Sequence, residues 1–175
     1  MLLIGPLGVG KSTIAAKLAN SLQKPRCCFD EVKFDYLSEA GFDLKTAHDI
    51  RDAKGIFAMW LYANRFSIEV LERVVAEHPG HIIDLGAGSH CFEEPEEIER
   101  AQAVFNSIET SILLMPSPDL ATSIRALPGV QEQRYMNTFF IMHPLNEAFA
   151  RQTVYTIGKT PDETATEIEA GSLST

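Results

Sequence analysis

A glycine-rich stretch with one lysine and one serine opens the chain and carries the residue types that bind phosphate. Residues 5–13 read GPLGVGKST, which matches the pattern G-x-x-x-x-G-K-[ST]. Gly5 and Gly10 let the backbone curl so that successive N–H groups point at phosphate oxygens. Lys11 adds a positive charge for the β- and γ-phosphates, and the Ser12 hydroxyl is a hard oxygen ligand for Mg²⁺. The stretch therefore predicts a phosphate-binding loop, or P-loop.

The segments on either side of this stretch are those that a P-loop requires. The apolar run 1–4 is typical of a short strand, and residues 11–22 have the pattern of a helix whose positive dipole end lies beneath the anion. We therefore expect ATP to bind here, with Mg²⁺ as the metal cofactor. The predicted nucleotide-binding residues of the loop are Gly5, Gly8, Val9, Gly10, Lys11, Ser12 and Thr13.

Two aspartates at the ends of predicted strands are candidates for the acids that phosphoryl transfer needs. One carboxylate holds Mg²⁺ and, in a kinase, another often orients the acceptor hydroxyl. Asp84 follows the short run 81–83 as a Walker B acid would, and we predict that it binds the metal together with Ser12. Asp30 follows the second predicted strand, and we predict a catalytic role and a contribution to the metal site. The alternative is that each aspartate caps the turn that follows it.

A polar segment in the second half of the chain is a candidate lid. Residues 128–137 lie where a mobile cover over the nucleotide could sit, and Arg134 within them is predicted to close over the phosphates and act in catalysis alongside Lys11 and Asp30. Arg125 and Arg151 could also pair with phosphate, or be surface arginines.

Composition limits the class of protein. With 175 residues, 45% of them hydrophobic and 22% charged, we expect one domain with a core, at residues 1–170, followed by a tail at 171–175. The net charge of −9 argues against a nucleic-acid partner and favours a small-molecule acceptor. No apolar stretch approaches the length of a membrane span, so we expect a cytoplasmic protein with no membrane partner; the oligomeric state stays open. Three cysteines without metal-ligand spacing predict free thiols.

Short apolar runs alternate with longer helical patterns along the whole chain. This alternation predicts an α/β fold of three layers, in which a five-stranded parallel sheet has helices on both faces. The carboxyl ends of the strands would then bring the P-loop, Asp30, residues 86–88 and the lid to one edge. Strands are predicted at 1–4, 26–29, 81–85, 110–115 and 153–157, and helices at 11–22, 32–40, 44–53, 56–78, 94–105, 117–127, 145–151 and 161–170.

The order of these landmarks resembles that of shikimate kinases and related small P-loop kinases, over nearly the whole chain. It is also similar to uncharacterised proteins labelled shikimate-kinase-like or ATPase. The resemblance rests on GPLGVGKSTIAAKLA, Phe29-Asp30, residues 84–88, residues 113–118 with Arg125, and residues 144–147, 153–156 and 160–164. It implies a P-loop NTPase fold with strand order 2-3-1-4-5. It also implies an ATP-dependent phosphotransferase that acts on a small hydroxyl-bearing molecule, and it implies that Arg125 contacts the adenine.

The chain departs from this family on the side of the site that would hold the acceptor. Val32 stands where shikimate kinases have a second aspartate, and residues 142–143 (Met-His) stand where they have an arginine that binds the substrate's carboxylate. Ala87 interrupts the glycine triplet, and Arg65 with Glu69 only loosely matches the family's Phe-Arg-x-x-Glu element. Since removing one partner of a buried charge pair costs about 2–5 kcal/mol, these departures argue against shikimate as the acceptor.

Two other functions stay open from the sequence. A nucleoside or nucleotide kinase would need aromatic groups around the acceptor base, which Phe34, Tyr36 and Trp60 could supply. A non-catalytic ATP-binding regulator would use the nucleotide to order the lid for a protein partner. A GTPase is disfavoured because no N-K-x-D motif occurs, and an ABC-type ATPase because no LSGGQ-like signature occurs.

Overall fold

Five parallel strands form one sheet at the centre of the molecule. The computed structural model describes residues 1–127 and 129–172, and in this part the strand order is β2-β3-β1-β4-β5, which confirms the predicted topology. The strands are β1 (Leu2–Ile4), β2 (Arg26–Cys28), β3 (Ile82–Asp84), β4 (Ser111–Met115) and β5 (Gln152–Tyr155). The helices are α1 (Lys11–Ser21), α2 (Phe29–Glu39), α3 (Leu44–Lys54), α4 (Ile56–Asn64), α5 (Ser67–Glu77), α6 (Pro95–Ser107), α7 (Leu120–Ala126), α8 (Gln131–Met142), α9 (Leu145–Phe149) and α10 (Pro161–Ser172).

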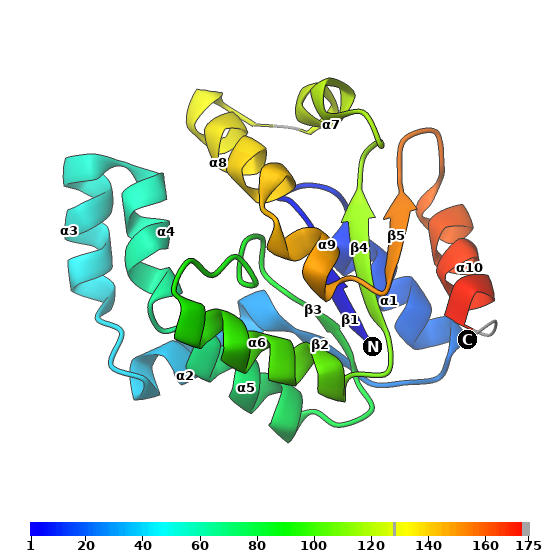
Figure 1. The fold of residues 1–175 in the computed structure, drawn as a ribbon, viewed down its shortest axis with the longest axis horizontal. Helices are drawn as coiled ribbons and strands as arrows, with labels where there is room; N and C mark the ends of the chain where they lie inside the picture. Colours follow the sequence, from blue (N-terminus) through cyan, green and yellow to red (C-terminus); the bar gives the residue numbers. More distant parts are fainter. Residues whose placement is uncertain (128, 173–175) are drawn as a thin grey trace.

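Helices cover both faces of the sheet because successive strand residues point to opposite sides. Leu2 and Ile4 belong to a core cluster with apolar side chains of α5, α6 and α9. Leu3, between them, belongs to a second cluster with side chains of α1 and α10. Figure 1 shows these layers, with the pair α3 and α4 standing apart from the sheet on the left and α7 and α8 at the top. The predicted three-layer α/β sandwich is confirmed.

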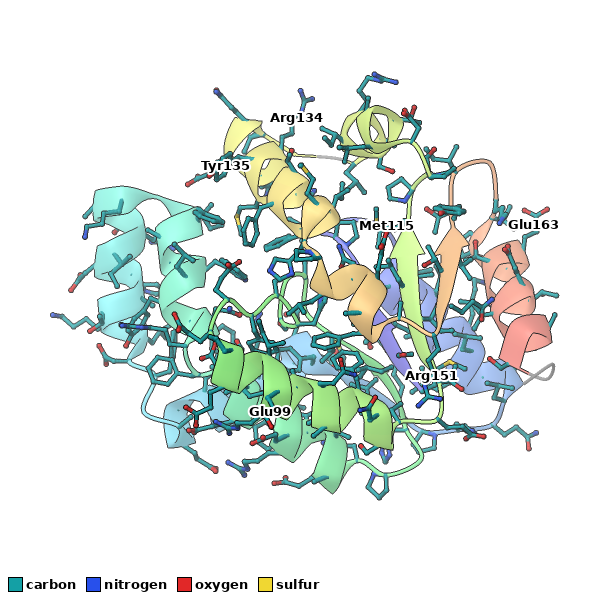
Figure 2. The ribbon with its side chains drawn as sticks, in the orientation of Figure 1. Glu99, Met115, Arg134, Tyr135, Arg151 and Glu163 are labelled. Carbon is teal, nitrogen blue, oxygen red and sulfur yellow. The ribbon has the colours of Figure 1, made fainter. Side chains whose placement is uncertain are left out.

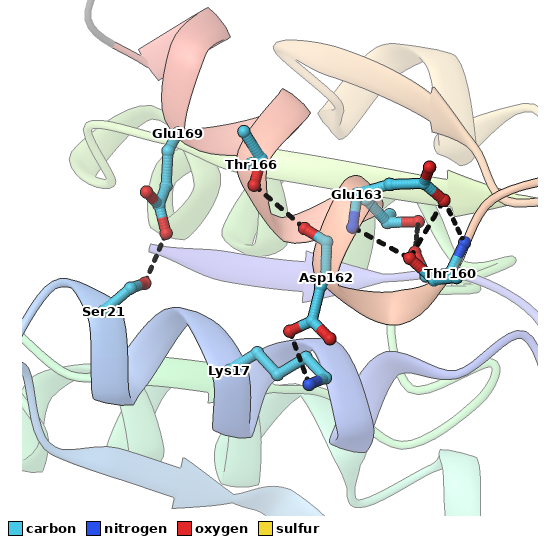
Figure 3. A network of polar contacts seen from close by, with 8 residues as sticks. Lys17, Ser21, Thr160, Asp162, Glu163, Thr166 and Glu169 are labelled. Atoms are coloured by element: carbon cyan, nitrogen blue, oxygen red, sulfur yellow. Dashed lines mark hydrogen bonds and ion pairs between the residues drawn. The ribbon is translucent and has the colours of Figure 1, made fainter.

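Polar pairs join the last helix to the first (Figure 3). Lys17 Nζ on α1 lies 2.6 Å from Asp162 Oδ1 on α10. One turn further along α1 and two turns further along α10, the Ser21 hydroxyl donates to the Glu169 carboxylate. These contacts hold α10 against the helix that begins at the P-loop.

A capping box starts α10 and sets its position. The Glu163 N–H donates to Thr160 Oγ1 at 3.2 Å, and the Thr160 N–H donates to Glu163 Oε2 at 2.7 Å. The helix continues to Ser172, whose hydroxyl donates to the Ile168 carbonyl. The prediction of a tail from residue 171 is therefore wrong for its first two residues, and residues 173–175 lie outside the described part of the chain.

The single helix predicted for residues 56–78 is two helices. α4 ends at Asn64 and α5 begins at Ser67, with the Phe66 N–H donating to the Ala63 carbonyl in a tightened turn between them. α4 packs against α8, whereas α5 packs against α2 and α6. Apolar periodicity runs through the break because both helices bury an apolar face, so the pattern does not reveal the change of direction.

The candidate lid is largely helical. Within the predicted segment 128–137, residues 131–137 form the first half of α8, and Pro128 lies outside the described residues. The helix before it is shorter than the predicted 117–127, since α7 begins at Leu120, where the Asp119 side chain accepts the capping hydrogen bond from the Thr122 N–H.

The chain turns at Gly5, where β1 leads into the P-loop. A substitution at Gly5 tests how tightly the fold constrains this turn. Its φ is +144°, and a Cβ built there would lie 2.3 Å from the Leu114 carbonyl oxygen of β4. We expect Gly5→Ala to lower the free energy of unfolding by about 3 kcal/mol. The matched control is Gly158→Ala, at φ +80° with no atom within 4 Å of the added Cβ, for which we expect about 1 kcal/mol. Urea denaturation measures both, and equal losses would contradict this role for Gly5.

Candidate active site

The P-loop adopts backbone angles that its glycines make possible. Gly5, Gly8 and Gly10 all have positive φ, at +144°, +81° and +99°, a region that other residues rarely adopt. The loop is open to ligands, since Leu7 and Gly8 are exposed. This curled backbone places N–H groups around a concave surface of the kind that binds anions.

The first turn of α1 extends that anion site. The earliest hydrogen bond within this helix runs from the Ile14 N–H to the Gly10 carbonyl, at 3.0 Å, so the N–H groups of residues 11–13 precede the intrahelical pattern. The side chains of Ser12 and Thr13 are exposed at the same place. N–H groups and the positive end of the helix dipole therefore fit a phosphate group.

The Lys11 ammonium is buried and held by the loop itself. Nζ donates to the carbonyl oxygens of Gly5 and Pro6, at 2.9 Å in each case. Burial lowers the pKa of Lys11 to about 8, although the negative charges of Asp30 and Asp84 partly oppose this shift. The protein thus keeps a desolvated cation within its phosphate loop, where an incoming phosphate would stabilise the charged form.

Asp84 lies beside the P-loop strand and is already paired. It ends β3, opposite Leu3 of β1, and its side chain is buried. Both carboxylate oxygens accept hydrogen bonds from the Arg26 guanidinium, at 3.0 Å each, and this pairing raises the pKa of Arg26. A metal ion at Asp84 would have to share the carboxylate with this guanidinium, so the predicted metal role of Asp84 stays a prediction.

Asp30 lies in the first turn of α2, which starts directly after β2 and three residues earlier than predicted. Its carboxylate is more than half exposed and lies 2.6 Å from Lys33 Nζ. A Cβ added at Gly86 would lie only 3.1 Å from Asp30 Oδ1. The loop after β3 therefore meets the end of β2 at this carboxylate, as predicted for the carboxyl edge of the sheet.

A cavity of about 420 Å³ opens between these loops and the helices α2, α3, α4 and α8. The P-loop contributes Leu7 to its lining, α2 contributes Asp30, and the loop after β3 contributes Gly86 and Ala87. Since the cavity touches both the phosphate loop and the exposed carboxylate, one small molecule could contact both. Its volume is in the range typical of small-molecule sites.

Asn137 joins α8 to the P-loop, a role that no sequence pattern predicts. Its Oδ1 accepts from the Leu7 N–H at 2.8 Å, and its Nδ2 donates to the Leu7 carbonyl at 3.1 Å. The side chain is almost completely buried. The amide thus replaces the partners that the Leu7 main chain would find in a regular element. A lone asparagine in an amphipathic helix belongs to no motif, and only its partner reveals its role.

The three candidate arginines lie in different places. Arg134 and Arg125 are exposed on α8 and α7, and Arg125 Nη2 donates to Thr122 Oγ1 on its own helix. Arg151 precedes β5 and so lies at the opposite edge of the sheet from the P-loop. Figure 2 shows Arg134 at the outer end of α8 and Arg151 far below it. The structure brings none of the three into contact with the loop, and it separates Arg151 from the site.

The described residues contain no cluster of three or more His, Cys, Asp or Glu side chains that could hold a metal ion. A P-loop Mg²⁺ does not need such a cluster, because the phosphates, water and a serine hydroxyl supply most of its ligands. The exposed Ser12 hydroxyl fits that arrangement. Cys27, Cys28 and Cys91 are free thiols, as predicted. No helix in residues 1–127 or 129–172 combines the length and apolar character of a membrane span.

A P-loop between the first strand and the first helix of a parallel sheet of order 2-3-1-4-5 defines a P-loop α/β fold. Solved shikimate kinases share this fold. The enzyme from Acinetobacter baumannii, in complex with shikimate, has a TM-score of 0.66 and 17% identity, covering 99% of this chain and 92% of its own. The enzyme from Aquifex aeolicus gives 0.66 and 22%, covering 99% and 95%, and that from Bacteroides thetaiotaomicron gives 0.59 and 16%, covering 99% and 97%.

No protein-family model matches the sequence, and no curated protein does. At the identities of the solved structures, the likeness establishes the fold. The chain therefore has the fold of shikimate kinases, as the order of its landmarks predicted.

The lowered pKa of Lys11 makes nucleotide binding depend on pH. Above about pH 8 the ammonium is increasingly neutral in the free protein, so Mg-ATP binding should take up a proton and its affinity should fall by up to about tenfold per pH unit. Calorimetry in two buffers of different ionisation enthalpy measures this uptake. Lys11→Arg is the matched control because arginine stays charged, and the same uptake in that variant would contradict the assignment to Lys11.

The same shift has a defined effect on stability. The pKa of Lys11 is about 8 in the folded protein and has the ordinary lysine value of 10.5 in the unfolded chain. Between these pH values the unfolded chain binds more protons, so the contribution of Lys11 to the free energy of unfolding rises with pH. Lys11→Arg should remove this rise from urea denaturation curves recorded between the two values.

Asn137 provides a separate test of the contact between α8 and the P-loop. We expect Asn137→Ala to lower the free energy of unfolding by about 2 kcal/mol, because two hydrogen bonds are lost and the Leu7 main chain loses its partners. Thr138→Ala is the control: its hydroxyl donates only within α8, to the Arg134 carbonyl, and we expect a loss of about 0.5 kcal/mol or less. Similar losses in urea denaturation would show that Asn137 has no special role.

Proposed function

We propose that this protein transfers the γ-phosphoryl group of ATP to a hydroxyl group of a small molecule other than shikimate. One observation carries the proposal: a single cavity is lined by Leu7 of the P-loop and by the exposed carboxylate of Asp30. An acceptor in that cavity would lie between the group that binds phosphate and a group able to receive a hydroxyl proton.

The proposed chemistry is mainly positioning and charge stabilisation. The N–H groups of the loop and the Lys11 ammonium would hold the β- and γ-phosphates and stabilise the charge that develops on them. Asp30 would orient the acceptor hydroxyl and accept its proton. Lys33, whose Nζ lies 2.6 Å from Asp30, would hold that carboxylate in position until the acceptor arrives.

Residues around the loop would complete the nucleotide site. Mg²⁺ bound at Ser12, with Asp84 and Asp30 as further candidate ligands, would neutralise charge on the β- and γ-phosphates. Arg134 is one helical turn from Asn137, which contacts the P-loop, so a small movement of α8 would bring its guanidinium toward the phosphates. Arg125 is the candidate for the adenine. These assignments are proposals.

The surroundings of two positions support an acceptor other than shikimate. Val32 packs against the apolar core under α2. Met142 is 62% exposed and outside the lining of the cavity, while the neighbouring His143 lies 3.2 Å from Glu93. Neither position supplies the charged group that, by the family resemblance, would hold shikimate.

Site variants and acceptor-dependent ADP release test the proposal together. ADP formation from Mg-ATP should depend on a hydroxyl compound, and Lys11→Ala should lower kcat/KM by several hundredfold, because about 3–4 kcal/mol of transition-state stabilisation is lost. Asp30→Asn should lower kcat by about a hundredfold or more, since general base catalysis contributes this much.

The controls are residues of the same type on the same helices. Lys17→Ala changes an exposed α1 lysine that pairs with Asp162, and Asp35→Asn changes an exposed α2 aspartate outside the cavity lining. Both should keep the wild-type rate. Normal turnover by Lys11→Ala would refute the assignment. A regulatory ATP-binding protein would be favoured if the protein binds nucleotide but none of the compounds tested causes ADP release. The panel contains sugars, nucleosides, aminoglycosides, hydroxy acids and simple alcohols.

A further inference from the structure

We propose that the acceptor is a neutral alcohol with a largely apolar body. Its body would fill the cavity between α2, α3, α4 and α8, and its hydroxyl would face Asp30. The inference deepens the proposed function and rests on it for the identity of the bound molecule as a phosphate acceptor. Three features of the cavity support it.

The first feature is the chemistry of the walls. Apolar side chains dominate the lining, and they come from elements that are far apart in sequence. An apolar wall favours a ligand in proportion to the apolar surface that the ligand removes from water, and it penalises a ligand whose hydroxyl groups would lose their hydration there. The polar side chains of the lining besides Asp30, Lys33 and Arg51 are His48, Asn64, Ser67, Ser89 and Gln133, so most of the surface of a polyol would face apolar side chains. The walls include Phe34 and Leu37 of α2, Met59 and Trp60 of α4, and Met136 and Phe140 of α8.

The second feature is a pair of half-exposed large apolar side chains at the rim, on α2 and α3, in addition to the exposed Leu7 of the P-loop. Phe34 is 51% exposed and Leu44 is 50% exposed, and both line the cavity. Single exposed apolar residues are common, but two at the mouth of one apolar cavity provide a surface that a ligand would cover. An occupant with an apolar body would shield both side chains and the walls behind them.

The third feature concerns charge. Lys33 and Arg51 are the lysine and arginine among the described residues of the lining, and each already has a carboxylate partner: Lys33 Nζ lies 2.6 Å from Asp30, and an Arg51 Nη lies 2.9 Å from Asp52. Each of these cations already has its charge matched by a carboxylate, so an anionic acceptor would gain less from it than from an unpaired cation. A neutral acceptor needs no cation.

The fluorescence of Trp60 reports on this cavity directly. Trp60 is the only tryptophan of the chain, and it lines the cavity. We propose to titrate the nucleotide-free protein with two neutral probes, cyclohexanemethanol and 4-phenyl-1-butanol, and with three polar ones, shikimate, myo-inositol and adenosine. At least one neutral alcohol should bind about tenfold more tightly than every polar compound, a difference of about 1.4 kcal/mol.

Variants at the rim localise the binding. Phe34→Glu and Leu44→Glu each place a charge where the apolar body would lie, and both sites are half exposed, so the fold should persist. Each substitution should lower the affinity for the neutral alcohols about tenfold. Leu61→Glu is the matched control, because Leu61 is 45% exposed on α4 but outside the cavity lining, and it should leave their affinity unchanged. Circular dichroism checks that all three variants are folded.

The outcomes separate this inference from the proposed function. Three results would each overturn the inference that the cavity takes an apolar alcohol. The first is tight binding of shikimate, inositol or adenosine, and the second is no binding of either neutral alcohol. The third is equal affinity for the alcohols in Phe34→Glu, Leu44→Glu and Leu61→Glu. If the neutral alcohols bind as expected but cause no ADP release from Mg-ATP, the site inference stands as an apolar-ligand site and the phosphotransferase proposal fails.

Discussion

The site depends on the way the chain turns at Gly5, between the first strand and the first helix. The Leu114 carbonyl of the neighbouring strand leaves no room for a side chain there, so the backbone must curl away from the sheet. This turn places the carbonyl oxygens of Gly5 and Pro6 where both accept a hydrogen bond from Lys11. A buried ammonium is costly without such partners. The loop and its lysine therefore stabilise each other, and both are ready for phosphate before a nucleotide binds.

The order of the strands places the other residues of the candidate site next to this turn. With β1 between β3 and β4, the P-loop lies beside Asp84 and next to the loop that follows β3, and β2 brings Asp30 to the same edge. α8 adds the fourth side, since Asn137 bonds to the Leu7 main chain. The aromatic contact between α4 and α8, in which the Trp60 and Phe140 rings lie 5.2 Å apart, closes the cavity against this helix. The cavity is thus bounded by elements from four separate stretches of the chain.

Much of this arrangement could be predicted from the sequence, and what could not has physical causes. The parallel sheet covered on both faces and the P-loop follow from local patterns: apolar runs of strand length, helical periodicity and glycine positions. The strand order follows from the resemblance to a known family. The break between α4 and α5 at residues 65–66 was not predicted, because apolar periodicity indicates which residues are buried and not the direction of the helix axis. The helix at residues 131–142 was not predicted, because the sequence of its first turn is polar and resembles that of a loop. The pairing of Asp84 with Arg26 and the role of Asn137 depend on neighbours that are distant in sequence, at 58 and 130 residues.

The fold, which is that of shikimate kinases, suggests ATP as the phosphate donor. The lining of the cavity suggests an acceptor other than shikimate. The P-loop half of the proposed site has the glycines, lysine and serine of its motif, while the proposed acceptor half is walled by aromatic and aliphatic side chains whose neighbouring cations are already paired. A scaffold that keeps its donor site and changes its acceptor pocket is consistent with the general separation of fold from substrate.

The most direct test of phosphoryl transfer is phosphorus-31 NMR of the protein with Mg-ATP and a neutral alcohol that binds in the cavity. The account predicts a new phosphomonoester resonance that grows in step with ADP and that needs both the alcohol and Asp30. Formation of ADP with inorganic phosphate alone, or an unchanged ATP spectrum in the presence of saturating bound alcohol, would contradict it.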